Sequence, residues 1–153
     1  MSVNRGVTFV ELLIVLAIIG IIVAITLPSF SSIKENQVLN NAVENVVSAL
    51  NKARTQTLSS LESSEYGVHF ESDQIVIFKG KVYSAVDPDN ESVEITSPAT
   101  ISNVTLGGVS GSEGELYFAR LSGVPDKSGT VTVSIAGNSK IITISSTGTV
   151  SKN

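Results

Sequence analysis

Few side chains in this 153-residue chain could do chemistry, and their types limit what the chain can do. His69 is the only histidine and there is no cysteine, so a thiol nucleophile, a thiolate metal site and a disulfide are excluded. A serine nucleophile would need a base and a group that orients the base, and no second histidine is available for that set. We therefore predict no catalytic residues and no enzyme. His69 is predicted to be a surface histidine in a strand, opposite Val68 and Phe70.

The densest cluster of oxygen ligands is Asp87–Glu91, with the sequence DPDNE. Carboxylate and amide oxygens at this density can hold calcium. The spacing lacks the glycine and the terminal glutamate of an EF-hand loop, and an Asp-Pro step favours the start of a turn. We predict a solvated turn here, and no metal site or cofactor in the chain.

The charge pattern bears on nucleic-acid binding. The formal net charge is −4, and Arg5 and Glu11 cancel within the N-terminal segment, so the remainder carries this whole charge. An acidic domain does not attract a phosphate backbone by its overall field. Lys79 and Lys81 flank Gly80 in a turn, whereas Lys127, Lys140 and Lys152 are scattered. The last three have no arginine or aromatic partners in the sequence, which makes a weak platform for bases or phosphates. We therefore predict no nucleic-acid partner, and this includes the region around Lys79, Lys81, Lys127, Lys140 and Lys152.

Glu11 is the one ionisable residue within Val7–Leu27, an otherwise apolar run of 21 residues. A helix of about 20 apolar residues spans the hydrocarbon core of a bilayer. By the positive-inside rule, Arg5 places the N-terminus in the cytoplasm and the rest of the chain outside. A carboxylate at mid-bilayer costs about 2.5–3.5 kcal/mol, and less near a helix end, so it calls for a partner. The alternatives are a plain anchor in which Glu11 reaches the headgroups, and a secretory signal peptide, for which TLPSFSS is a poor small-x-small cleavage site.

A second helical segment, 29–64, is expected to follow. Its apolar residues recur mostly three and four positions apart, which indicates an amphipathic helix: Ile33, Leu39, Val43, Val46, Leu50, Ala53 and Leu58. Pro28 is predicted to kink the helix rather than to end it. The helix would then run from Val7 to about Leu61, roughly 80 Å at 1.5 Å per residue.

Residues 65–153 change to the alternating pattern of strands, punctuated by turn residues. AGNSK, after Ile135, is typical of a hairpin turn. Short connections favour an antiparallel sheet, against which the amphipathic helix can pack, so the predicted fold class is α+β. The expected strands are Tyr66–Phe70, Gln74–Phe78, Lys81–Val86, Val93–Thr96, Thr100–Leu106, Glu115–Arg120, Thr130–Ala136 and Lys140–Ser145.

The N-terminal segment RGVTFVELLIVLAIIGIIVAITLP resembles the processing signal of type IV prepilins and pseudopilins. The resemblance implies that residues 1–6 are a leader, that a prepilin peptidase cuts between Gly6 and Val7, and that the new amine of Val7 is methylated. Gly20 and Pro28 stand where that superfamily commonly has them, whereas Phe or Met is more usual than valine at position 7. Glu11 matches the glutamate of the motif. Its natural partner is the freed amine of Val7 on a neighbouring subunit, which would set the register between subunits.

The later sequence resembles the GspH/FimT-type minor pseudopilins and minor pilins, on SEYGVHF, LYFARLSGVPDKSGTVTV and ITISSTGTVSK. That family has a long helix followed by a β-domain that often ends in a strand, a glycine and a final short strand. The resemblance implies a structural subunit of a type IV pilus or of a type II secretion pseudopilus. Its partners would be other pilin subunits, an inner-membrane assembly platform and the peptidase. The alternatives are a major pilin and a DNA-binding minor pilin of a competence pilus.

Overall fold

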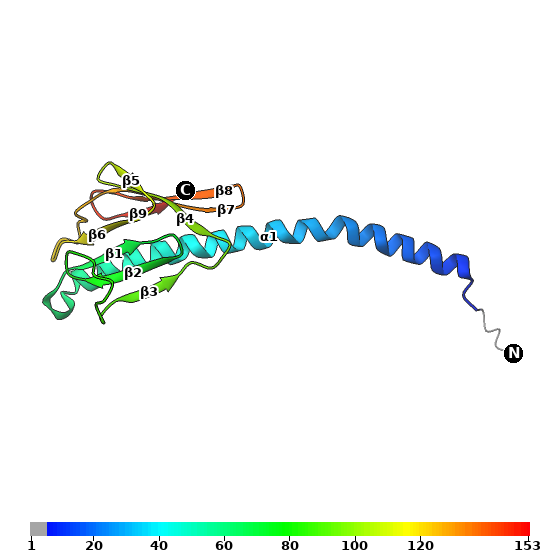
Figure 1. Ribbon diagram of the computed structural model, residues 1–153, viewed down its shortest axis with the longest axis horizontal. Helices are drawn as coiled ribbons and strands as arrows, with labels where there is room; N and C mark the ends of the chain where they lie inside the picture. Colours follow the sequence, from blue (N-terminus) through cyan, green and yellow to red (C-terminus); the bar gives the residue numbers. More distant parts are fainter. Residues whose placement is uncertain (1–5) are drawn as a thin grey trace. The chain divides into compact units, whose positions relative to one another are not determined.

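A computed structural model describes the backbone of residues 6–153 and the side chains of residues 6–25 and 33–153. One α-helix, α1 (Phe9–Leu58), and a short 3-10 helix, η1 (Leu61–Ser63), precede a series of strands (Figure 1). The chain divides into two compact units, Met1–Lys34 and Glu35–Asn153. The boundary falls within α1, so the second half of the helix belongs to the same unit as the strands.

The strands of the second unit are all antiparallel and form two sheets. The four-stranded sheet has the order β3-β2-β1-β6, and the five-stranded sheet has the order β5-β4-β7-β8-β9. The strands are β1 (Tyr66–Phe70), β2 (Gln74–Lys79), β3 (Glu91–Glu94), β4 (Thr100–Leu106), β5 (Val109–Gly111), β6 (Gly114–Phe118), β7 (Gly129–Ile135), β8 (Asn138–Ile144) and β9 (Val150–Lys152).

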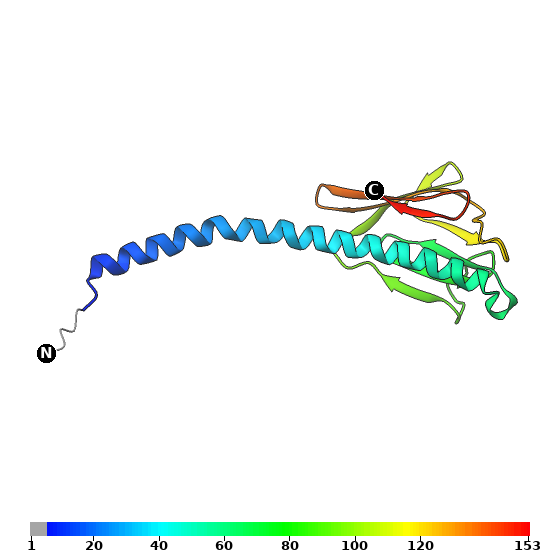
Figure 2. The ribbon, with the colours of Figure 1, turned by 180° about the vertical axis from the view of Figure 1, so that it is seen from behind.

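The second half of α1 supplies one face of a core that both sheets share. Seen from behind, this part of the helix passes in front of green strands of the four-stranded sheet, and the orange and red strands of the five-stranded sheet lie above it (Figure 2). Its buried side chains follow the helical period, as predicted, whereas Leu58 is 44% exposed and Ile33, in the first unit, is 63% exposed. From the helix, the core contains Leu39, Ala42, Val43, Val46, Ala49, Leu50 and Ala53, packed in one cluster with the inward residues of both sheets.

Two tight hairpins set the register of the five-stranded sheet. Ala136 and Gly137 join β7 to β8 with positive φ angles of 33° and 87°, and this is the hairpin predicted from AGNSK. Gly107 and Gly108 join β4 to β5 in the same way, with φ angles of 59° and 84°. Two-residue loops with positive φ match the right-handed twist of paired strands, which is why glycine is favoured in them.

Polar contacts fasten the second half of α1 to both sheets. Lys52 pairs with Glu91 of β3 at 2.7 Å, and Glu44 pairs with Lys152 of β9. Arg54 donates from Nε to the Gly123 carbonyl at 3.0 Å, and from Nη2 to the carbonyl of Thr147 at 3.1 Å. Glu91 and Gly123 lie in or next to strands of the four-stranded sheet, and Thr147 and Lys152 lie in or next to strands of the five-stranded sheet. The helix therefore links the two sheets within one unit.

The predicted α+β fold, a long helix with an antiparallel β-domain, is confirmed, but three details of the prediction were wrong and β5 was not predicted. There are two sheets in the described chain where one was expected. Residues 81–86 form a loop instead of a strand, because β2 already pairs with β1 on one edge and with β3 on the other. The helix ends at Leu58 rather than near Leu61, and Ser60, Glu62 and Ser63 follow with positive φ angles that no α-helix adopts.

The predicted kink at Pro28 and the end of the predicted membrane span both fall within residues 26–32 of α1. The helix is assigned without a break across Pro28, but the side chain of Pro28, and with it the predicted kink, lies outside the described residues. Within the described part of the chain, no helix is long and apolar enough to cross a membrane. Thr26 and Leu27, the last residues of the predicted span, are also among those whose side chains are not described.

Candidate functional site

The candidate processing site, Gly6 and Val7, lies in an exposed, non-helical segment just before α1. Val7 is 74% exposed. A Cβ atom built on Gly6 would have no neighbour within 4 Å, so packing within the described chain does not require a glycine here. A small residue does let an extended backbone enter a protease cleft closely. The geometry therefore suits recognition by another protein. The rest of the predicted leader, residues 1–5, lies outside the described residues.

Thr8 caps the start of α1. Its carbonyl accepts from the Leu12 N–H at 3.1 Å, and its Oγ1 accepts from the Glu11 N–H at 3.3 Å. The order Thr-x-x-Glu is the sequence pattern of a capping box, in which the acid stands at the third helical position. Glu11 thus occupies the first turn, where a negative charge is also favoured by the helix dipole. This role of Thr8 was not predicted, although the TFVE pattern contains the signal.

The helix surface beyond the cap is apolar on all sides. Every large apolar side chain from Val7 to Ile25 is exposed, by 46% to 74%. Contiguous exposed apolar surface of this extent marks a site that another protein or a membrane covers. The first unit therefore combines a helix start capped by Thr8, with Glu11 in its first turn, and a long apolar surface that another protein or a membrane would cover.

His69 is more enclosed than a surface histidine. Its ring stacks on Tyr83, with centroids 4.0 Å apart and an interplanar angle of 12°. Nε2 lies 3.5 Å from Glu71, Nδ1 lies 3.9 Å from Glu115, and the histidine side chain is only 14% exposed. Within the described residues, the buried Nδ1 has no hydrogen-bond partner. His69 thus belongs to a small cluster on the outer face of the four-stranded sheet, where the side chain was expected to be exposed.

Tyr83 builds this cluster from the loop that was predicted to be a strand. Its N–H donates to the Glu115 carboxylate at 3.3 Å, and its ring also lies 5.8 Å from that of Phe78. Burial, helped by the nearby charge of Glu71, raises the pKa of Tyr83 above its usual value. Loop residues 81–90 therefore cover the outer face of β2, which explains why Phe78 is buried although it points away from the main core.

Residues 87–90 of the acidic segment form a turn, as predicted, and Glu91 begins β3. The Asp89 N–H donates to Oδ1 of Asp87 at 3.0 Å, and the Asn90 side chain donates to the Ser84 carbonyl at 2.8 Å. The carboxylates serve separate partners: Asp89 lies 3.6 Å from Lys79, and Glu91 pairs with Lys52. Among the described residues there is no group of three or more histidine or acidic side chains that could hold a metal ion.

The five lysines considered for DNA contact each have a partner in the second unit. Lys79 pairs with Glu62 as well as with Asp89, and this carboxylate contact raises the pKa of Lys79. Lys127 donates to the backbone carbonyl of Glu115 at 3.2 Å. The remaining contacts are Lys81 with Glu65, Lys140 with Asn40, and Lys152 with Glu44. Each of these five lysines is therefore already engaged with a group of its own unit.

Comparison with protein families finds one match, to the prokaryotic N-terminal methylation motif, over residues 1–27. Neither the curated proteins nor the solved structures contain a match to this chain. The matched segment includes Gly6, Val7, Thr8 and Glu11. The chain therefore carries the type IV prepilin-like signal, followed by a long helix and an antiparallel β-domain that fit the pilin fold.

Proposed function

We propose that this chain is a minor pilin or pseudopilin, a structural subunit of a type IV pilus or of a type II secretion pseudopilus. The observation that carries the proposal is the methylation motif at residues 1–27, placed ahead of a capped helix whose apolar surface is exposed on all sides. A prepilin peptidase would remove residues 1–6, and Val7 would become the methylated N-terminus. The role is structural, not enzymatic.

The first half of α1 would serve two successive environments. Before assembly it anchors the chain in the inner membrane, with the N-terminus in the cytoplasm and the β-domain outside. An assembly platform in that membrane would then transfer the helix into a filament, where helices of other pilin subunits replace lipid. Exposed apolar side chains suit both environments, since neither requires a polar face on this segment.

Glu11 would fix the position of each subunit in the filament. After cleavage, the amine of Val7 on one subunit and the Glu11 carboxylate of its neighbour could pair among apolar helices. A charge buried alone is costly, so subunits would assemble in the register that pairs both groups. The capping geometry supports this arrangement, because it holds Glu11 in the first turn, close in sequence to the new terminus.

The resemblance of the later sequence to GspH/FimT-type subunits favours a minor subunit. A major pilin is the second candidate, favoured by two surface features of the β-domain that could join repeated copies, the exposed Leu121 and the pocket between β5 and β6. A DNA-binding minor pilin has less support, because the lysines that could contact phosphate are engaged with other groups.

The proposal is tested by the intact mass of the protein extracted from membranes of cells that contain a prepilin peptidase. We expect a chain that begins at Val7 and carries one methyl group. The matched control is a strain without the peptidase, in which the mass should retain residues 1–6. A chain that keeps Met1 in the presence of the peptidase, or that is cut near Ser29, would overturn the proposal.

A further inference from the structure

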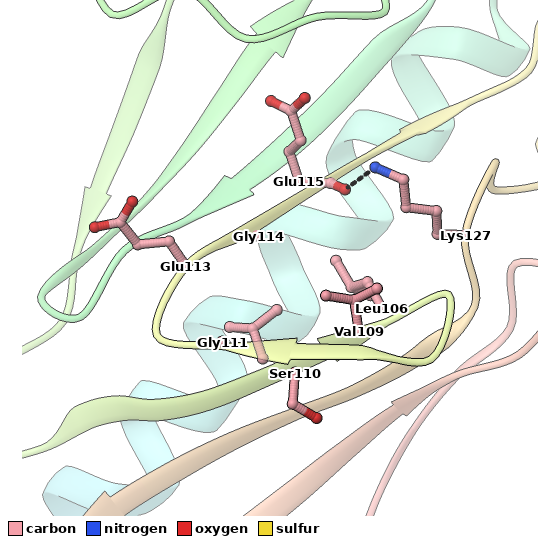
Figure 3. A pocket seen from close by; sticks show the side chains of 9 residues that line it. Leu106, Val109, Ser110, Gly111, Glu113, Gly114, Glu115 and Lys127 are labelled. Carbon is pink, nitrogen blue, oxygen red and sulfur yellow. Dashed lines mark hydrogen bonds between the residues drawn. The ribbon is translucent and has the colours of Figure 1, made fainter.

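A pocket of about 340 Å³ opens between the edges of the two sheets. β5 is the last strand of one sheet and β6 is the last strand of the other, so the pocket lies between two strand edges that the described chain leaves without a neighbouring strand. Figure 3 shows the side chains of Leu106 and Val109 directed into the space between these strands. Val104 lines it as well, and Gly114 keeps its wall open, because a Cβ atom there would lie 2.8 Å from Val104.

The rim of this pocket carries an uncompensated negative charge. Glu113 lines the pocket from the turn between β5 and β6, is exposed and points outward (Figure 3), and its carboxylate has no ion-pair or hydrogen-bond partner among the described residues. The one cation at the rim, Lys127, is already engaged with the Glu115 carbonyl at 3.2 Å and with Asp126 at 3.7 Å. An apolar group that carries a positive charge beside it would therefore match this pocket.

The same domain presents such a group at the other end of β6. Leu121 is 82% exposed and has a φ angle of 66°, a left-handed conformation that is unfavourable for leucine. Arg120, next to it, is exposed and has no side-chain partner within the described residues. The turn is held in shape, since the Gly123 N–H donates to the Ala119 carbonyl at 2.9 Å. A strained residue that projects an apolar side chain into solvent is a sign of function.

The tip (Arg120 and Leu121) cannot reach the pocket of its own chain. β6 runs roughly 13 Å from Gly114 to Phe118 at about 3.3 Å per residue, with the pocket at its start and the tip beyond its end. Two different surfaces that fit each other on the same molecule make a head-to-tail contact. Such a contact closes into a ring or repeats without limit, and the second outcome is the geometry of a filament.

We propose that Leu121 of one copy inserts into the β5–β6 pocket of a second copy, where Arg120 pairs with Glu113. This contact would join neighbouring subunits within the filament, so its role rests on the proposed function of the chain as a filament subunit. Because the contact joins two copies of this chain, it favours a subunit that repeats along the filament over one that is present once.

The absence of native cysteine allows a direct test on the full chain in membranes. Two copies with different tags are produced together, one with Leu121→Cys and the other with Val109→Cys, and are oxidised. We expect a mixed disulfide dimer several-fold above the level given by Leu121→Cys with Val86→Cys. Val86 is a stringent control, since it is 90% exposed and lies outside the pocket. A mixed dimer no more abundant than this control would overturn the proposal.

Charge reversal tests the rim pair in the same assay. Arg120→Glu in the copy with Leu121→Cys, or Glu113→Arg in the copy with Val109→Cys, should lower the yield several-fold, and both changes together should restore it. If the yield of mixed dimer is the same with and without the charge reversals, the cross-link reports non-specific proximity and the proposed contact is overturned. The mass of the mature chain is measured on the same samples. A processed chain without the cross-link overturns only the contact, whereas the cross-link in an unprocessed chain supports the contact and overturns the filament role.

Discussion

The two halves of α1 have similar apolar residues and opposite surroundings. Between Val7 and Ile25, large apolar side chains are 46% to 74% exposed, whereas the core residues between Leu39 and Ala53 are 0% to 3% exposed. The second half finds its cover within the chain, in two sheets that are fastened to it by ion pairs and by Arg54. The first half finds none among the described residues. The apolar content of a helix therefore does not show whether the chain itself buries it. That depends on whether other elements of the same chain pack against the apolar side chains.

The largest expected effect comes from the one charge on the first half. Glu11→Val should accumulate in the membrane and still be cut after Gly6, yet fail to join other pilin subunits. Deleting one member of a buried ion pair costs about 3–5 kcal/mol, which changes incorporation by orders of magnitude. The measurement is recovery of the variant with other pilin subunits from solubilised membranes.

Glu11→Gln separates the two roles of this residue. Glutamine can still stand at the third position of a capping box, but it carries no charge. If register depends on the charge, the glutamine variant should be lost from the filament as the valine variant is. Equal recovery of wild type and both variants would remove the ion-pair mechanism.

The second effect compares one leucine from each half. Leu50→Ala should lower the free energy of unfolding of the β-domain by about 2–5 kcal/mol, because Leu50 is fully buried in the core. Leu16→Ala should leave that free energy unchanged, since Leu16 is 56% exposed and lies in the other unit. Denaturant titration of the full chain in detergent checks both. Similar losses for the two variants would contradict the division of the helix.

Features set by residues close together in the sequence could be predicted, whereas features set by contacts between distant residues could not. β1 and β4 were predicted to the residue, because their alternation and their turns are local signals. The strand predicted over residues 81–86 failed because pairing of β2 on both edges is a property of the whole sheet. The enclosure of His69 was missed for the same reason, since it depends on Tyr83 folding over from that loop. β5, with three residues between glycine-rich turns, gave too short a pattern to detect.

The third effect compares two glycines. A Cβ atom at Gly129 would lie 1.8 Å from the Thr105 carbonyl oxygen, so Gly129→Ala must push β7 away from β4 and should cost about 1–3 kcal/mol. At Gly20 a Cβ atom would meet nothing within 4 Å, and alanine is the better helix former there by about 1 kcal/mol. Thermal unfolding of the full chain in detergent should therefore show a lower midpoint for the first variant only. Unchanged melting of Gly129→Ala would contradict the close approach of these strands.

The smallest effect concerns an exposed fastening between helix and sheet. Glu44 and Lys152 pair across the second unit, but their side chains are 57% and 54% exposed. Pairs of this kind contribute about 0.2–1 kcal/mol, and salt screens them. Lys152→Ala should therefore lower the free energy of unfolding by no more than about 1 kcal/mol, with the difference shrinking as salt is added. A loss as large as that of Leu50→Ala would mean that the ion pair, rather than the core, holds the helix to the sheets.

The most direct measurement of the central claim is the reactivity of single cysteines placed in the two regions of the native protein. Leu16→Cys reports on the first half of α1, and Val86→Cys reports on a loop that is 90% exposed. Both variants are treated with a membrane-impermeant maleimide in intact membranes and in isolated filaments, and both should react fully once the protein is denatured. If other molecules cover the first half of the helix, Val86→Cys reacts at once and Leu16→Cys stays protected in both preparations. Equal labelling of the two in the native protein would contradict this account.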